Sequence, residues 1–179
     1  MIVDLNGWLH GLSPGTKVIE LGGGSMPQHR PNVDVRPCFD AAGQLTVDFT
    51  ADFGQPLPIM SDEWDVVFSR YAIEHISWRL VRGFITEVFR ILKPGGTAVV
   101  ITANGEAQMR WALAQDWDEK VSQCLCGDLD YPENSHKVFF NPTWATRLFR
   151  EAGFGHVLVY RHGELGTDMV IEAAKIPGA

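Results

Sequence analysis

Short apolar runs alternate along the chain with segments of helical periodicity. Seven runs have the length and the β-branched or aromatic side chains of strands; they lie at 17–21, 32–35, 45–49, 64–69, 97–102, 157–160 and 169–174. The fourth and fifth runs carry almost no charge, as strands buried on both faces do. This alternation predicts an α/β fold with a mostly parallel sheet flanked by helices.

The clearest helical pattern lies between the fourth and fifth predicted strands. Its apolar residues recur at steps of three and four; they are Val81, Phe84, Ile85, Val88 and Leu92. The run Lys93-Pro94-Gly95-Gly96 is expected to end this helix and turn the chain. A second helix is expected to begin at Asn141-Pro142, a capping residue followed by a proline at the first helical position.

The connections between the strands indicate how the sheet is built. Only residues 162–166 join the last two predicted strands, too few for a crossover helix, so these strands must pair antiparallel. We therefore predict a doubly wound, mostly parallel seven-stranded sheet that finishes in a C-terminal antiparallel hairpin. Residues 105–127 read as a helix and turn inserted after the fifth strand. About eleven residues separate the first two strands, near the lower limit for a parallel crossover. This connection holds one helical turn at most, or the second strand lies elsewhere.

Composition narrows the class of protein. The chain has 179 residues, of which 45% are hydrophobic and 21% charged. With no repeat or linker, this predicts one globular domain over residues 1–179.

The N-terminus lacks the basic region of a signal peptide. No stretch reaches the roughly 20 apolar residues of a membrane span. Three cysteines suggest reduced thiols and a cytoplasmic location. The net charge of −7 makes a nucleic-acid partner an unfavourable expectation.

A glycine-rich loop follows the first predicted strand. Val18-Ile19-Glu20-Leu21 leads directly into Gly22-Gly23-Gly24. The loop lies at the carboxyl edge of a parallel strand, where doubly wound sheets bind ligands. A G-x-G-x-x-G fingerprint that starts at Gly22 would need a glycine where Pro27 stands, so binding of a pyrophosphate is disfavoured.

Carboxylates stand at three successive strand ends. They are Glu20, Asp34 and Asp52. Taken singly, Asp34 and Asp52 read as ordinary turn residues. As a set they predict a ligand rich in hydrogen-bond donors, because carboxylates accept hydrogen bonds and repel phosphate.

The order of these segments resembles the class I S-adenosylmethionine (SAM)-dependent methyltransferases, especially small ones with a shortened first half. The resemblance rests on V-I-E-L-G-G-G at 18–24, N-V-D-V at 32–35, D-F-G-Q-P-L-P at 52–58, W-D-V-V-F-S-R-Y-A-I-E-H-I at 64–76 and F-R-I-L-K-P-G-G-T at 89–97. It implies a Rossmann-like fold and an enzyme that transfers a methyl group from SAM to an unidentified acceptor, which we expect to be a small molecule. The alternative is a non-catalytic SAM-binding module that serves as a scaffold for a partner.

The resemblance also implies roles for individual residues. Glu20 and the glycines Gly22, Gly23 and Gly24 would cradle the methionine part of SAM. Asp34 would accept from the ribose hydroxyls. Asp52 would accept from the adenine amino group, and Phe53 would contact the ring. The residues leaving the fourth strand would line the pocket near the sulfonium; these are Ser69, Arg70 and Tyr71. Met26 stands where many relatives have a third glycine.

Two histidines are candidate general bases. His75 follows the fourth strand, where the acceptor should approach, and imidazole accepts protons near neutral pH. His136 lies in the polar segment 127–137, which we expect to contact the acceptor. The alternative for each histidine is a packing or capping role. Cys124 and Cys126 without a second nearby pair fall short of a structural zinc site, so no metal is expected.

Overall fold

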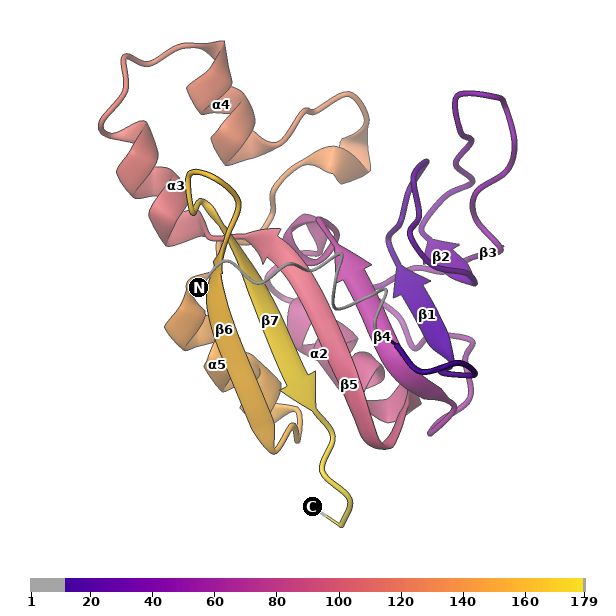
Figure 1. Ribbon diagram of the computed structural model, residues 1–179. Coiled ribbons are helices and arrows are strands. Elements are labelled where there is room, and N and C mark those ends of the chain that lie inside the picture. The colour runs from indigo at the N-terminus through magenta and orange to yellow at the C-terminus, as the bar shows by residue number, and fades with distance from the viewer. Residues whose placement is uncertain (1–11, 179) are drawn as a thin grey trace.

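The computed structural model describes residues 12–178 and contains a seven-stranded sheet (Figure 1). The strands are β1 (Val18–Leu21), β2 (Asn32–Asp34), β3 (Phe49–Thr50), β4 (Trp64–Arg70), β5 (Leu92–Ala103), β6 (His156–His162) and β7 (Asp168–Ala174). Their order across the sheet is β3-β2-β1-β4-β5-β7-β6. The first five run parallel, and β7 pairs antiparallel with both β5 and β6. The predicted mostly parallel sheet with a terminal antiparallel hairpin is confirmed.

This topology brings the ends of several strands together at one edge of the sheet. The five parallel strands all finish there, and β7 begins there because it runs the other way; in Figure 1 this is the upper edge. Side chains that follow the parallel strands therefore meet side chains that precede β7.

Two helices cover one face of the sheet, α2 (Val81–Ile91) and α5 (Pro142–Glu151) (Figure 1). The predicted stripe of α2 is buried from Val81 to Val88. Leu92 is buried too, but it begins β5 rather than ending the helix, because its backbone is already extended. The Asn141 side chain accepts from the backbone N–H of Trp144, which confirms the predicted cap of α5.

The first half of the sheet is compact. Within the described residues no helix lies between β1 and β4, and residues 22–31 form turns. The second strand lies where predicted, but the third was predicted at 45–49 and lies at Phe49–Thr50. Contacts with other segments of the chain, rather than the local sequence, set the position of β3. Asp48 uses its side chain to accept from the Asn32 N–H at 2.7 Å, and Leu45 bridges to Phe39 instead of joining the sheet.

The insertion after β5 consists of two helices rather than one. They are α3 (Gly105–Ala112) and α4 (Glu119–Cys126), and both stand beyond the carboxyl edge (Figure 1). Two short 3-10 helices, η1 (Ile73–His75) and η2 (Pro132–Asn134), border the same edge.

No helix within residues 12–178 is long and apolar enough to cross a bilayer. The predicted absence of a signal peptide concerns a segment that lies largely outside the described residues.

Candidate functional site

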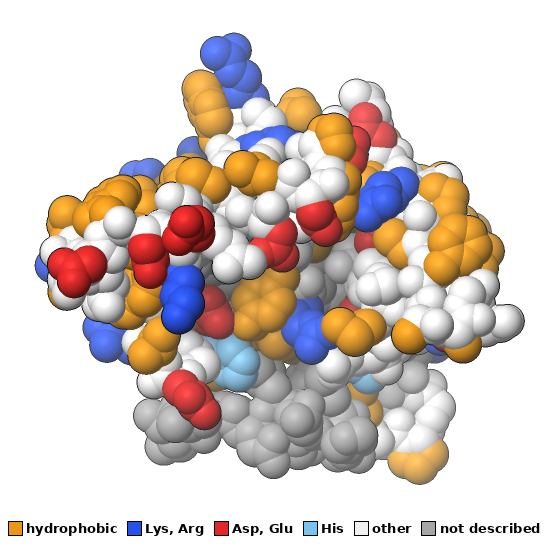
Figure 2. All heavy atoms as spheres, turned by 90° about the horizontal axis from the view of Figure 1, so that it is seen from above, with side chains coloured by type: hydrophobic (Ala, Val, Ile, Leu, Met, Phe, Trp, Pro, Cys, Tyr) orange, Lys and Arg blue, Asp and Glu red, His pale blue; other side chains and the backbone are white. Residues whose placement is uncertain are grey.

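A cavity of about 600 Å³ opens at the carboxyl edge of the sheet. Its walls come from the glycine loop, from the segments after β2, β3 and β4, and from the stretch around η2. Figure 2 looks down on this edge and shows histidine, acidic and basic side chains near its middle. Of the residues predicted to bind a cofactor or act in catalysis, seven line the cavity: Gly22, Gly24, Asp34, Asp52, Phe53, Tyr71 and His75.

The glycine loop passes tightly against the start of η1. Gly22 has φ +81°, and a Cβ added there would lie 2.3 Å from the Cβ of Ala72. No side chain fits at this position without moving the loop. Gly24 also has a positive φ, and its N–H donates to the Asp34 carboxylate at 3.0 Å. The loop is therefore held against the end of β2.

Glu20 lies beneath the glycine loop, and neither Glu20 nor Gly23 of the loop lines the cavity. The buried Glu20 carboxylate accepts from the N–H groups of Gln28 and His29 at 2.6 and 2.7 Å. Burial raises the pKa of this carboxyl group above its ordinary value of 4.5. A Cβ added to Gly23 would lie 2.9 Å from the second Glu20 oxygen. Glu20 thus shapes the loop from below.

Two aspartates present carboxylates to the cavity from neighbouring strand ends. One Asp34 oxygen accepts from Gly24, and the other accepts from the N–H of Val35 at 2.7 Å. Asp52 accepts from the N–H of Gly54 at 2.8 Å. Because each carboxylate oxygen has two lone pairs, both aspartates retain acceptor capacity toward a ligand. Phe53 is 5% exposed and packs its ring 5.1 Å from that of Phe84.

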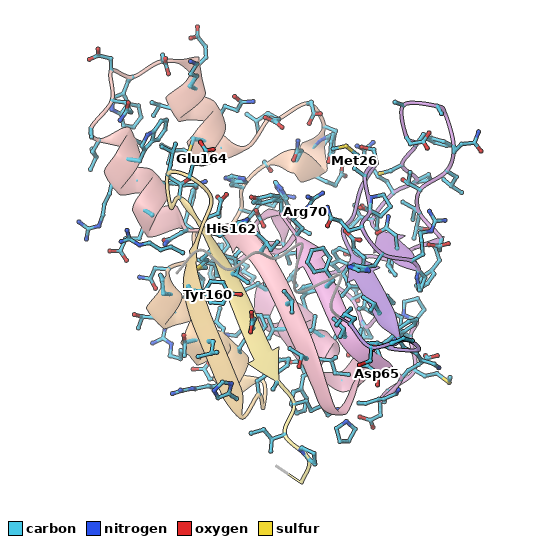
Figure 3. The ribbon with its side chains drawn as sticks, viewed as in Figure 1. Met26, Asp65, Arg70, Tyr160, His162 and Glu164 are labelled. Carbon is cyan, nitrogen blue, oxygen red and sulfur yellow. The ribbon has the colours of Figure 1, made fainter. Side chains whose placement is uncertain are left out.

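The three residues that leave β4 point in different directions. The buried Ser69 hydroxyl donates to the Leu21 carbonyl at 2.8 Å and lies outside the cavity lining. Arg70 reaches toward the glycine loop, 3.4 Å from the Met26 carbonyl; both residues are labelled at the upper edge in Figure 3. Tyr71 has a strained φ of +50°, lines the cavity and donates its hydroxyl to Asp168 at 2.8 Å.

His75 and His136 come together, with ring centroids 5.2 Å apart. Each Nδ1 lies next to a backbone carbonyl, that of Ser135 at 3.0 Å for His75 and that of Leu125 at 3.2 Å for His136. A carbonyl only accepts, so each Nδ1 carries the proton and each Nε2 keeps a lone pair. Burial lowers the pKa of both imidazoles, so both are neutral at pH 7. His136 itself is not part of the cavity lining.

The structure adds residues that sequence reasoning missed. Glu74 is 1% exposed, and burial raises its pKa to about 7. Asp168 begins β7 and is drawn to the site through Tyr71. Tyr131 and Lys137 also line the cavity, but both belong to the segment 127–137 that the sequence analysis had already selected. Asp168 had a readable signal, because an antiparallel last strand must begin at the edge where the parallel strands end.

Residues 33–100 match the family described as methyltransferase domain. The matched segment runs from β2 into β5 and includes both cavity aspartates and His75. Solved methyltransferase structures superpose on most of the chain. This is a class I SAM-dependent methyltransferase fold. The resemblance drawn from the sequence motifs is confirmed.

The methyltransferase structures cover nearly all of the chain at low sequence identity. A SAM-dependent methyltransferase from Thermotoga maritima has a TM-score of 0.65 at 19% identity, over 93% of this chain and 86% of that one. A methyltransferase in complex with the Haloferax volcanii Trm112 methyltransferase activator gives 0.63 at 16%, over 94% and 86%. Phosphoethanolamine N-methyltransferase 2 of Haemonchus contortus, solved with SAM, gives 0.65 at 12%, over 96% and 51%. No curated protein matches the chain in sequence.

Proposed function

We propose that the chain binds SAM in the cavity at the carboxyl edge and transfers its methyl group to a small-molecule acceptor. One observation carries the proposal. The glycine loop, Asp34 and Asp52 follow three successive parallel strands and line one cavity. A fold alone does not define a function, whereas converging polar groups define a site.

The chemistry of the cavity matches the donor groups of SAM. Asp34 would accept from the ribose hydroxyls and Asp52 from the adenine amino group, with Phe53 against the ring. Gly22 and Gly24 would hold the methionine part, and Glu20, Gly23 and Ser69 would support them from outside the lining. SAM supplies a methyl group that is already activated by its sulfonium.

The acceptor side is proposed to lie between Tyr71, His75 and the segment 127–137. Because the donor is activated, the chain mainly has to orient the acceptor. A base is needed only for an acceptor that must lose a proton. The candidate base is Nε2 of His75, whose lone pair is free and which lines the cavity. His136 would support His75 from behind.

Volume and charge favour a small acceptor. A cavity of about 600 Å³ falls in the ordinary range for small-molecule sites. A net charge of −7 disfavours a polyanionic substrate. The cysteines Cys38, Cys124 and Cys126 are free thiols, which supports a reducing compartment such as the cytoplasm.

Calorimetry with SAM, S-adenosylhomocysteine (SAH) and NAD tests the proposal. We expect micromolar dissociation constants for SAM and SAH, about −8 kcal/mol, and no heat with NAD. Mass spectrometry of the purified protein should detect retained SAH if the chain turns over. Binding of NAD without SAM or SAH would refute the proposal. Binding of SAM without methyl transfer to any acceptor would favour the non-catalytic scaffold.

A further inference from the structure

Three side chains able to ligate a metal meet beside the acceptor half of the cavity. Glu74, His75 and His136 each offer one ligand atom, and these atoms lie within 4.8 Å of one another. Glu74 and His75 are neighbours in η1, whereas His136 lies 61 residues after His75 in the sequence. Spacing in the sequence gives no sign of this set.

Both imidazoles are oriented as metal-binding histidines are. Metal-bound histidines usually donate the second ring N–H to a carbonyl or carboxylate, which fixes the tautomer and the ring. The Nδ1 atoms of His75 and His136 lie 3.0 and 3.2 Å from the carbonyls of Ser135 and Leu125. The two Nε2 lone pairs are therefore left for a ligand.

The backbone holds the set together independently of any ion. The carbonyl of Glu74 accepts from the N–H of Lys137 at 2.8 Å, and the N–H of His136 donates to the Cys126 carbonyl at 2.9 Å. These bonds fix His136 between α4 and η1. At Gly127, an added Cβ would meet the Asn134 carbonyl oxygen at 2.4 Å, so the two segments approach closely because this residue is glycine.

The carboxylate of Glu74 is buried, yet no Lys or Arg within the described residues pairs with it. Its oxygens accept from the Thr102 hydroxyl at 2.9 Å and from the Ala103 N–H at 3.4 Å. The backbone N–H of Glu74 also donates to this carboxylate, so three donors use its four lone pairs only in part and at least one lone pair remains free. Burying a carboxylate without a compensating cation is costly, and a bound metal ion would remove that cost.

We propose that Glu74, His75 and His136 bind one divalent transition-metal ion, of which Zn²⁺ is the best fit. Two imidazoles and one carboxylate suit zinc better than magnesium or calcium, which prefer oxygen ligands. Zinc takes its nitrogen and oxygen ligands at about 2.0–2.2 Å, so the side chains must draw together by about an ångström. A set of three protein ligands leaves the fourth position open, as in catalytic zinc sites.

A metal ion here would lie next to His75, which is part of the cavity lining. The ion would bind the Nε2 lone pairs of both His75 and His136. His75 could then not act as a general base while the ion is bound. The ion's open position would suit an acceptor with a hydroxyl, thiol or amine, whose pKa it would lower. This consequence rests on the proposed function, whereas metal binding itself does not.

Calorimetric titration of tag-free, EDTA-treated full-length protein with Zn²⁺ tests the site. We expect one ion per chain and a raised melting temperature, because the ion binds the folded state. In crystals soaked with Zn²⁺, anomalous scattering should place the ion between the three side chains. SAH binding is measured on the same samples, so failure of the metal site and failure of the proposed function are distinguishable.

Variants separate this site from other zinc ligands. Glu74→Gln and His136→Ala should each weaken Zn²⁺ binding by at least about 10-fold, with the fold checked by circular dichroism. His156→Ala removes an exposed histidine of β6 and should leave the affinity unchanged. Cys124→Ser/Cys126→Ser should also retain binding. No stoichiometric binding, an anomalous peak at the two cysteines, or unchanged affinity in Glu74→Gln would overturn the proposal.

Discussion

The guanidinium of Arg36 lies 3.7 Å from the centroid of the Tyr131 ring. Arg36 follows β2 and Tyr131 precedes η2, and both Asp34 and Tyr131 line the cavity. This cation–π contact joins two segments that are far apart in the sequence. It joins the segment after Asp34, proposed to bind the cofactor, to the segment 127–137, proposed to bind the acceptor.

Removing this contact should speed the release of SAH. Arg36→Ala is expected to raise the dissociation rate by about 2–5-fold, since an exposed cation–π contact contributes about 0.5–1 kcal/mol. Tyr131→Phe keeps the ring but loses the hydroxyl that accepts a hydrogen bond from Arg36, so it should release SAH at a rate between those of wild type and Arg36→Ala. Arg79→Ala is the matched control, because Arg79 lies over the ring of its own neighbour Trp78 and joins no separate segments. Stopped-flow fluorescence measures the rates, and equal rates in Arg36→Ala and wild type would contradict this role.

The substitution Asp52→Asn tests the cofactor site more sharply than removal of the whole Asp52 side chain would. Asp52→Asn keeps an oxygen for the Gly54 N–H but replaces the other carboxylate oxygen with a donor. We expect SAH affinity to fall by about 1–3 kcal/mol, roughly 5- to 150-fold, with little change in stability. Calorimetry gives the affinity and urea unfolding the stability.

The control for Asp52→Asn is Asp65→Asn, at the far end of the sheet from the cavity (Figure 3). Asp65 pairs with Lys93 at 2.7 Å on the surface, where such pairs contribute at most about 1 kcal/mol. Asp65→Asn should bind SAH normally. Normal binding by Asp52→Asn as well would exclude Asp52 from cofactor recognition.

Much of the fold was readable from the sequence, and the reason lies in periodicity. The stripe of α2 and the charge-poor β4 and β5 each carry many residues of one repeating pattern. β3 has only two residues, and side-chain bonds from Asp48 decide where it lies, so no local pattern could position it.

The candidate site was only partly readable. Asp34 and Asp52 were found because parallel strand ends share one edge. Glu20 and Ser69 stand in the same motifs but are turned away from the cavity toward backbone groups, which a motif does not reveal. The juxtaposition of Glu74 with His136 depends on how the segment after α4 folds back, and no periodicity records that.

Glu20 predicts a dependence of stability on pH. Burial raises its pKa above 4.5, so the folded state favours the protonated carboxyl group. The stabilisation is complete below pH 4.5 and is lost as the pH rises through the raised pKa, because the folded protein must then ionise a buried group. Glu20→Gln cannot ionise. The free energy of unfolding of the wild type minus that of the variant, measured by urea unfolding, should therefore fall as the pH rises above 4.5. A difference independent of pH would show that burial of this carboxylate is not coupled to folding.

Two glycine-to-alanine substitutions should have opposite effects on stability. A Cβ at Gly23 would lie 2.7 Å from the Asn32 side-chain oxygen and 2.9 Å from both Glu20 Oε1 and the Cβ of Pro27. Because the added Cβ is crowded on three sides, Gly23→Ala should lower the free energy of unfolding by about 1–3 kcal/mol. It should also weaken SAH binding, because the loop must shift.

Gly83 is the matched control, since it lies exposed within α2 and an added Cβ meets nothing within 4 Å. Gly83→Ala should stabilise the protein by about 0.4–1 kcal/mol, because alanine restricts the unfolded chain and favours helix. Its SAH affinity should equal that of the wild type. Urea unfolding and calorimetry on both variants measure the two effects. If Gly23→Ala proved as stable as the wild type, Glu20 and Asn32 would have to lie further from the loop than they do here, and the close support of the loop from below would be wrong.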